Sequence, residues 1–384
     1  MHIGFLTPEY PHPKLGASGG LGTSIKNLAE ALSVENVKVT VFVYGQKQDE
    51  IFSENGIIFH RIKQRRTPFL TWFTYRKYLQ NYLNRVAKTE KIDLIEAPDW
   101  TGITAFMNLL VPLVIRFHGS DAYFCHLEGR KQKRKNFWFE KQAVQSAQAF
   151  IAPTTFAGNL SKEIFGLKNK TVQTIHYGLK LPDFSNAHPN DFEMGTLLYI
   201  GTIIRKKGVL ELPEIFKKVV SVFPNSQLIL IGSDSPDIQT QSSSTWKLVE
   251  EKLDADMRSK VKYLGKIPYD EVQNHIRKAH VCLFPTFAET LGMVTIESMA
   301  LQKPVVNSNI GWANELIEDG ISGFLAHPKD HDLYADRIIA LLDNPELCRE
   351  MGENARQRVE EKFDIQKVVQ ENIRFYQSFL NQSI

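Results

Sequence analysis

The chain has 384 residues, of which 43% are hydrophobic and 23% are charged, as in an ordinary soluble globular protein of two or three domains. The net charge of +3 is too small for a chain-wide nucleic-acid surface, and the scattered Cys125, Cys282 and Cys348 give neither a disulfide framework nor a zinc spacing. Residues 1–8 are interrupted too early for a signal peptide, and no apolar run reaches the roughly 18 residues that a membrane span needs. We therefore expect a cytoplasmic protein in a reducing setting.

Short apolar runs alternate with helix-length segments along the chain. The runs expected to form strands are 3–6, 37–43, 92–96, 113–117, 150–152, 171–175, 196–200, 227–231, 261–264, 281–284 and 304–307. The segments expected to form helices include 21–33, 69–89, 211–222 and 269–278. Most of the runs are apolar at every position, which is typical of parallel strands buried on both faces. This order predicts α/β domains with doubly wound parallel sheets and right-handed crossovers.

A polar segment divides the chain near its middle. Residues 178–195 contain two prolines and have neither a helical nor a strand period, so they are expected to form an interdomain linker. This places an N-terminal domain at 1–180 and a C-terminal domain at 190–364. The last helical stretch, 365–384, is not followed by a further strand, and in a two-domain protein such a tail often packs back on the first domain.

Two basic segments precede aromatic ones. Residues 61–66 are followed by Phe69, Trp72, Phe73, Tyr75 and Tyr78, and residues 130–135 by Phe137, Trp138 and Phe139. Cations beside aromatic side chains suit an anionic membrane surface. A solvated helix face beside core aromatics explains the same pattern, and the sequence leaves both interpretations open.

The segment 284–300 predicts a ligand site. The strand 281–284 ends before Pro285, a loop with Gly292 follows, and a helix begins near Met293. Open α/β sheets bind ligands beyond the carboxyl ends of their strands, and the start of a helix offers N–H groups to a phosphate. Glu289 before the helix and Glu297 inside it can accept hydrogen bonds from sugar or ribose hydroxyls. Taken alone, the two acids also fit simple stabilisation by the helix dipole.

An ordered series of motifs resembles the retaining glycosyltransferases of family four. Glu289 and Glu297 match the E-x7-E motif of that family, preceded by a proline and followed by Ser-Met-Ala. Further matching segments are 19–23, 118–121, 199–201, 206–208, 263–265, 303–306, 311, 315–320 and 323–325. The resemblance covers nearly the whole chain and is densest from 196 to 330. It implies the GT-B fold, in which two Rossmann-like domains face each other across a cleft, with the donor bound mainly by the C-terminal one.

The resemblance also implies how the donor is held. Glu297 would bind the nucleotide ribose, and Glu289 would bind the donor sugar. Gly20, in the first turn of the N-terminal domain, would let the backbone approach the donor phosphates. Backbone N–H groups would meet the sugar and the diphosphate, from Thr290, Leu291, Gly292 and Met293.

Further residues are expected to act on the reaction itself. Lys207 would neutralise the diphosphate, and His118 would lie beside the reactive face of the transferred sugar. The chain has Gly201-Thr202 where the family often has Gly-Arg, and Arg205 would supply the missing cation.

Other aspartates have more than one interpretation. Asp121 is interpreted either as an acceptor contact or as the cap of the following helix, and Asp99 likewise as an acceptor-side residue or a cap. Asp254-Ala255-Asp256 has the spacing of a metal-binding D-x-D, but its charged surroundings favour a solvated helix face, so no metal ligand is assigned.

The sequence therefore predicts a glycosyltransferase that moves a sugar from a UDP- or GDP-linked donor to a saccharide or lipid-linked acceptor, with retention of configuration and without a required cofactor. The expected setting is surface polysaccharide or glycoconjugate synthesis in the cytoplasm, with an anionic membrane surface as a possible partner and no nucleic acid. The alternatives are a nucleotide-sugar epimerase of the same fold and a non-catalytic nucleotide-sugar-binding protein. A dinucleotide-dependent dehydrogenase is disfavoured, because no G-x-G-x-x-G follows the first strand.

Overall fold

A computed structural model describes residues 1–16 and 18–382 of the chain. The chain divides into two compact units. The first contains Met1–Lys180 and the segment that begins at Asp364, and the second contains Leu181–Phe363. Each unit has its own sheet and its own hydrophobic core.

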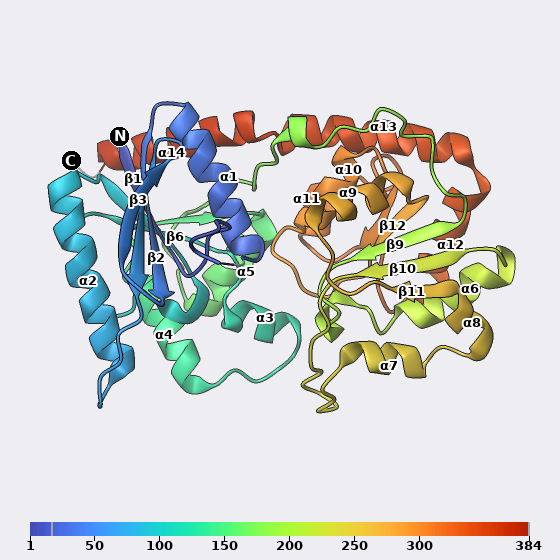
Figure 1. The fold of residues 1–384 in the computed structure, drawn as a ribbon, viewed down its shortest axis with the longest axis horizontal. Coiled ribbons are helices and arrows are strands. Elements are labelled where there is room, and N and C mark those ends of the chain that lie inside the picture. Colours follow the sequence, from blue (N-terminus) through green and yellow to red (C-terminus); the bar gives the residue numbers. More distant parts are fainter. Residues whose placement is uncertain (17, 383–384) are drawn as a thin grey trace. The chain divides into compact units, whose positions relative to one another are not determined.

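The sheet of the first unit has, within the described residues, eight strands in the order β3-β4-β2-β1-β5-β6-β7-β8 (Figure 1). The pairings are parallel except for the antiparallel pair β3–β4 at one edge. The strands are β1 (His2–Thr7), β2 (Lys38–Gln46), β3 (Glu50–Glu54), β4 (Ile57–Lys63), β5 (Leu94–Pro98), β6 (Leu113–Arg116), β7 (Ala149–Ala152) and β8 (Val172–Thr174). The strand order reverses direction between β1 and β5, so the loops that follow these two strands open onto a common crevice.

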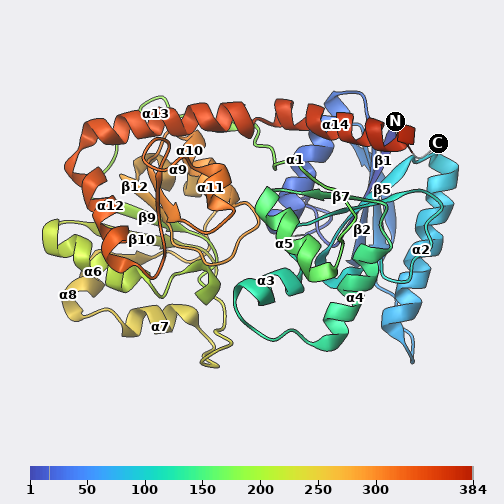
Figure 2. The same cartoon turned by 180° about the vertical axis from the view of Figure 1, so that it is seen from behind.

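The helices of the first unit cover its sheet and include the C-terminal helix of the chain. They are α1 (Gly20–Val34), α2 (Thr71–Glu90), η1 (Trp100–Gly102), α3 (Asp121–Leu127), α4 (Arg134–Gln145), α5 (Thr155–Phe165) and α14 (Ile365–Gln382). Helix α14 lies alongside α1 (Figures 1 and 2), and it places Val368, Val369 and Tyr376 in the hydrophobic core under the sheet.

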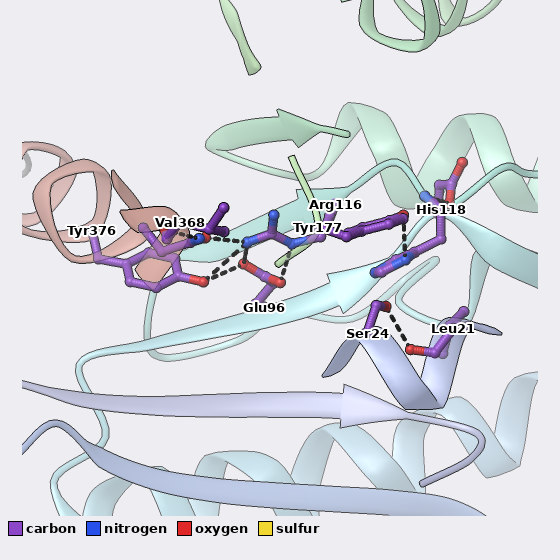
Figure 3. A network of polar contacts seen from close by, with 10 residues as sticks. Leu21, Ser24, Glu96, Arg116, His118, Tyr177, Val368 and Tyr376 are labelled. Atoms are coloured by element: carbon purple, nitrogen blue, oxygen red, sulfur yellow. Dashed lines mark hydrogen bonds and ion pairs between the residues drawn. The ribbon is translucent and has the colours of Figure 1, made fainter. Parts of the chain in front are cut away.

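A buried polar network joins α14 to the sheet (Figure 3). Arg116, the last residue of β6, donates to both carboxylate oxygens of Glu96 on β5, at 2.7 and 3.1 Å, and to Asn372 Oδ1 at 2.6 Å. The Tyr376 hydroxyl donates to the same carboxylate at 2.7 Å. Because both charged side chains are only 3% exposed, the pair is stable only while these hydrogen bonds replace the lost water.

The sheet of the second unit has, over the described chain, six parallel strands in the order β11-β10-β9-β12-β13-β14. The strands are β9 (Thr196–Ile200), β10 (Gln227–Ile231), β11 (Val261–Tyr263), β12 (Val281–Phe284), β13 (Val305–Ser308) and β14 (Phe324–Ala326). This is the doubly wound order 3-2-1-4-5-6, in which the direction of winding changes between the two central strands, β9 and β12.

Helices cover both faces of this sheet. They are η2 (Leu181–Asp183), η3 (Arg205–Lys207), α6 (Leu212–Val222), α7 (Thr245–Glu251), α8 (Ala255–Lys260), α9 (Tyr269–Lys278), α10 (Met293–Ala300), α11 (Ala313–Leu316), α12 (His331–Asp343) and α13 (Pro345–Lys362). Helices α6 and α12 pack together, and α10 packs against α13.

The predicted parallel strands are confirmed, and those at 196–200, 227–231 and 281–284 have the predicted bounds. The strands β3, β4 and β14 were not predicted. Strand β3 is at the edge of the sheet, and its Ile51 is 64% exposed. Strand β4 is mostly buried, but His60 and Arg61 interrupt its apolar run, so neither sequence has the continuous apolar signal of a buried parallel strand. Strand β14 has only three residues, which is too short for a period to be recognised.

Removing one partner of the network should destabilise the first unit strongly. Arg116→Ala leaves the Glu96 carboxylate buried without its cation, and we expect it to lower the free energy of unfolding by about 3–5 kcal/mol. Tyr376→Phe removes the hydrogen bond that the hydroxyl donates to Glu96 and the one that it accepts from Arg116, and should cost about 1–3 kcal/mol. Urea denaturation measures both. The double variant Glu96→Leu/Arg116→Met should recover much of the lost free energy of unfolding. If the double variant is destabilised as much as Arg116→Ala, the buried-pair interpretation is contradicted.

Candidate functional site

The loops that follow the two central strands of the second sheet, β9 and β12, contact each other. The loop after β9 contains η3, and the loop after β12 leads into α10. The Lys206 carbonyl accepts from the Phe287 N–H at 2.8 Å and from the Thr286 hydroxyl at 3.2 Å, which ties the loops to each other. Gly208 has a φ of +73°, and a Cβ there would lie 1.7 Å from the Pro285 carbonyl oxygen, so only glycine permits this approach.

The tied loops place a lysine beside a carboxylate. Lys207 Nζ forms an ion pair with Glu289 Oε1, and the two side chains are 23% and 18% exposed. Residues predicted separately, 82 positions apart, therefore meet at the carboxyl edge of the sheet. The lysine is held where an incoming anion could exchange with the carboxylate.

Helix α10 begins next to this pair. Its N-cap, Gly292, has a φ of +99° and no capping side chain, so the first N–H groups of the helix are not satisfied by a cap. Thr290 and Leu291, just before it, are 6% and 0% exposed, so a ligand would meet mainly their backbone. This geometry suits an anion at the helix N-terminus.

The second acid of the motif, Glu297, lies inside α10. It is 8% exposed and forms a hydrogen bond with the hydroxyl of Tyr269, the first residue of α9. Burial raises the pKa of Glu297 to about 7, although the bond from Tyr269 opposes the shift. Tyr269 was not predicted as a site residue, because its contact depends on how α9 packs against α10 and leaves no local pattern.

Arg205 has a partner that the sequence did not indicate. Its guanidinium donates to both carboxylate oxygens of Asp237, each at 2.8 Å. These bonds hold the pKa of Asp237 well below its usual range. The Asp237 carboxylate also accepts from the backbone and hydroxyl of Thr240, so the arginine is fixed in one orientation.

His118 follows β6 in the first unit and is oriented by two residues. Its backbone N–H donates to Asp99 Oδ1 at 2.9 Å, and its Nδ1 lies 2.8 Å from the Tyr177 hydroxyl (Figure 3). The rings of His118 and Tyr177 stack with centroids 5.4 Å apart. Burial and the nearby Arg116 lower the pKa of His118 to about 3, so the imidazole is neutral at physiological pH. Tyr177 was missed because it lies 59 residues further along the chain.

The turn after β1 is organised by an acid. Glu9 Oε1 accepts from the N–H groups of Gly19 and Gly22, at 3.0 and 2.9 Å, at the start of α1. Gly20 itself has no atom within 4 Å of where a Cβ would lie. The space beside Gly20 stays a predicted place for donor phosphates, and Glu9 was not predicted to contribute.

The acidic residues Asp121 and Asp99 have structural partners. Ser120, and not Asp121, caps α3 by accepting from the Tyr123 N–H, so the cap interpretation of Asp121 is wrong. Asp121 instead pairs with Arg130, whose hydrogen bond lowers the pKa of the carboxyl although burial opposes this. Asp99 is 0% exposed, and burial raises its pKa to about 7. Its contact with the backbone of His118 favours a positioning role over a direct acceptor contact.

The D-x-D segment is part of an exposed helix. Asp254 caps α8 by accepting from the Met257 N–H, and Asp256 pairs with Lys260. Within residues 1–16 and 18–382 no group of three metal-ligating side chains is found. None of the helices in these ranges has the length and apolarity needed to cross a bilayer.

Two family models match the chain, one for each unit. Glycosyltransferase Family 4 matches residues 18–181, and Glycosyl transferases group 1 matches residues 183–358. An uncharacterized glycosyltransferase of Methanocaldococcus jannaschii is 26% identical over 372 residues, which is 95% of either chain.

Solved structures share the whole fold. A sucrose-phosphate synthase from Thermosynechococcus elongatus has a TM-score of 0.81 at 19% identity and covers 99% of both chains. The Anabaena protein HepE, in complex with UDP and glucose, has a TM-score of 0.71 at 17% identity over 98% of this chain and 100% of that one. The chain is a glycosyltransferase with the GT-B fold.

The raised pKa of Glu297 predicts a pH-dependent stability of this glycosyltransferase. In the unfolded chain the carboxyl ionises near 4.5, and in the folded chain near 7, so the unfolded state loses its proton first as the pH rises. The contribution of Glu297 to stability is therefore full below pH 4.5 and falls as the pH rises to about 7, by up to about 3 kcal/mol.

This prediction is tested by thermal unfolding of the wild type and Glu297→Gln across that pH range. The glutamine of the variant cannot ionise. The melting temperature of the wild type should therefore fall relative to that of the variant as the pH rises. A difference that does not change with pH would show that the carboxyl is not buried as described.

Proposed function

We propose that the protein transfers a sugar from a UDP- or GDP-linked donor to a saccharide or lipid-linked acceptor, with retention of configuration. The observation that supports this most directly is the convergence of Lys207, Glu289, Glu297 and the uncapped start of α10 at the change of winding in the second sheet. Surface polysaccharide or glycoconjugate synthesis is the proposed setting, in the cytoplasm or at the inner face of its membrane.

The donor is proposed to lie across these groups in a fixed order. Glu297 accepts hydrogen bonds from the ribose hydroxyls, and the start of α10 receives the diphosphate. Lys207 turns from Glu289 to a phosphate oxygen, which leaves the Glu289 carboxylate for the hydroxyls of the sugar. Arg205, held by Asp237, presents a second positive charge toward the same diphosphate. Gly20 is proposed to let the backbone approach the donor phosphates.

The chemistry is proposed to depend on the leaving diphosphate. As the bond from the anomeric carbon to the phosphate oxygen breaks, negative charge grows on the diphosphate, and Lys207, Arg205 and the α10 dipole stabilise it. The departing phosphate takes the proton of the acceptor hydroxyl on the same face of the sugar, which gives retention without a protein nucleophile. His118, neutral and oriented by Tyr177, is proposed to hydrogen-bond the transferred sugar, with Asp99 positioning it. Asp121 stays a candidate on the acceptor side.

A thermal-shift titration with UDP, GDP and ADP tests the donor site. A nucleotide that binds only the folded state raises stability by RT ln(1 + [L]/Kd), about 2.7 kcal/mol at a hundredfold excess over Kd. We expect one of the three nucleotides to raise the melting temperature with or without magnesium. In Glu297→Ala the same nucleotide should no longer raise it.

A matched comparison separates the ribose contact from the phosphate contact. Lys207→Ala should weaken the binding of the nucleoside diphosphate but not the binding of the corresponding nucleoside. Glu297→Ala should weaken the binding of both. If neither variant changes the binding of the nucleotide, the site lies elsewhere on the chain.

His118→Ala should affect turnover more than donor binding. Removing one group that stabilises the transition state lowers the rate about a hundredfold. The rate of nucleoside diphosphate release from the donor sugar measures turnover, and the thermal shift by the nucleotide serves as the control. A loss of the thermal shift in this variant would mean that His118 maintains the fold and does not act on the sugar.

A further inference from the structure

Two stretches of the first unit contain no acidic residue. Residues 55–89 and 129–139 hold 13 of the 46 lysines and arginines of the chain and none of its 43 acids. The rest of the chain therefore has more acids than lysines and arginines. A charge distribution this uneven concentrates positive potential on part of one unit.

The fold brings these two stretches together. Helices α2 and α4 lie side by side, with the loops that precede them at the same end (Figures 1 and 2). The rings of Trp72 and Trp138 are 6.4 Å apart, and those of Trp72 and Phe139 are 5.0 Å apart. Lys135 Nζ lies 5.8 Å from the centre of the Trp72 ring. The starts of both helices therefore form one surface, which we call the α2–α4 surface.

Large apolar side chains are exposed on the α2–α4 surface. Phe69 is 84% exposed, Leu70 60% and Trp138 45%. Two hydrogen bonds hold the loop that carries Phe69: the Thr67 hydroxyl donates to the Phe69 carbonyl at 2.8 Å, and the Thr71 hydroxyl donates to the Thr67 carbonyl at 2.7 Å. A purely solvated helix face would present polar side chains at these positions.

Several cations around these apolar side chains have no acidic partner. Arg65 pairs with Asp49, and Arg130 pairs with Asp121 and Glu128. In the described part of the chain, ion pairs are not found for Arg66, Lys131, Lys133 and Arg134. Their charge is available to an anionic partner.

The surface is continuous with the end of the sheet that carries His118. Arg76 on α2 donates to the carbonyls of Thr101 and Gly102 in η1, and its guanidinium lies 4.5 Å above the ring of Phe139 on α4. Asp99, which precedes η1, accepts from the His118 backbone. A partner bound to the α2–α4 surface would therefore be held at a fixed place relative to His118.

We infer that the α2–α4 surface docks the protein on an anionic lipid bilayer, with Phe69, Leu70 and Trp138 entering the headgroup region and the unpaired cations facing lipid phosphates. Leu70 favours a bilayer over a nucleic acid, because bases stack on exposed aromatic rings whereas an exposed aliphatic side chain gains most from an apolar phase. The docking itself is independent of the proposed function. The further step, in which docking presents a lipid-linked acceptor to His118, rests on the proposed function.

Vesicle sedimentation of the full chain tests the inference. Wild-type protein should sediment with vesicles of phosphatidylcholine and phosphatidylglycerol, but not with phosphatidylcholine alone, and added salt should weaken the binding. Reversing the charge at Arg66, Lys131, Lys133 and Arg134 with glutamate should abolish it, since each removed cation weakens binding about fivefold. Matched controls are Lys168→Glu/Lys170→Glu and Val34→Ser, at exposed positions of the same unit, which should bind as the wild type does.

Tryptophan emission tests insertion separately from attraction. Brominated lipids should quench the wild type, and the variant Phe69→Ser/Leu70→Ser, which keeps Trp138 as the reporter, should lose most of the quenching. All variants should keep the thermal shift by the nucleotide, which reports on the donor site and separates this inference from the proposed function. Equal binding of wild type and charge-reversal variant to the vesicles would overturn the inference. So would salt-sensitive binding to single-stranded DNA or heparin without quenching by lipid.

Discussion

The change of winding between β9 and β12 is the constraint on which the site of the second unit depends. Parallel strands end at the same edge of a sheet, and where the winding changes direction the two following loops turn away to opposite faces. The space left between them cannot be filled by a crossover helix. In this chain the loop after β9 contributes Lys207, and the loop after β12 contributes Glu289 and the start of α10. Gly208 allows the two loops to approach closely enough for these groups to meet.

Carboxylates hold the groups that are proposed to receive anions. Glu289 holds Lys207, Asp237 holds Arg205, and Glu9 accepts from the N–H groups at the start of α1. Such pairs keep the cations and N–H groups oriented, and a ligand then competes with the carboxylate rather than ordering a mobile side chain. The pairs differ in how easily they would exchange. Asp237 is 2% exposed and is held by additional bonds from Thr240, whereas Glu289 is 18% exposed.

The sequence predicted most of what depends on local pattern. Buried parallel strands such as β9 and β12 are apolar at every position, and the Glu289 and Glu297 pair has a fixed spacing, so both were recognised. The partners that orient the site were not. Asp237, Tyr177 and Tyr269 reach Arg205, His118 and Glu297 only through packing of distant elements, and the intervening sequence gives no periodic signal. The network of Glu96, Arg116 and Tyr376 was hidden for the same reason, since it joins residues more than 250 positions apart.

A nucleoside diphosphate is proposed to bind at the carboxyl edge of the second sheet. A crystal structure of the protein with the nucleotide that stabilises it tests this most directly. We expect the ribose within hydrogen-bonding distance of Glu297, the diphosphate at the start of α10, and the Lys207 ammonium moved from Glu289 to a phosphate oxygen. A nucleotide bound away from β9 and β12, with the pair of Lys207 and Glu289 intact, would contradict it.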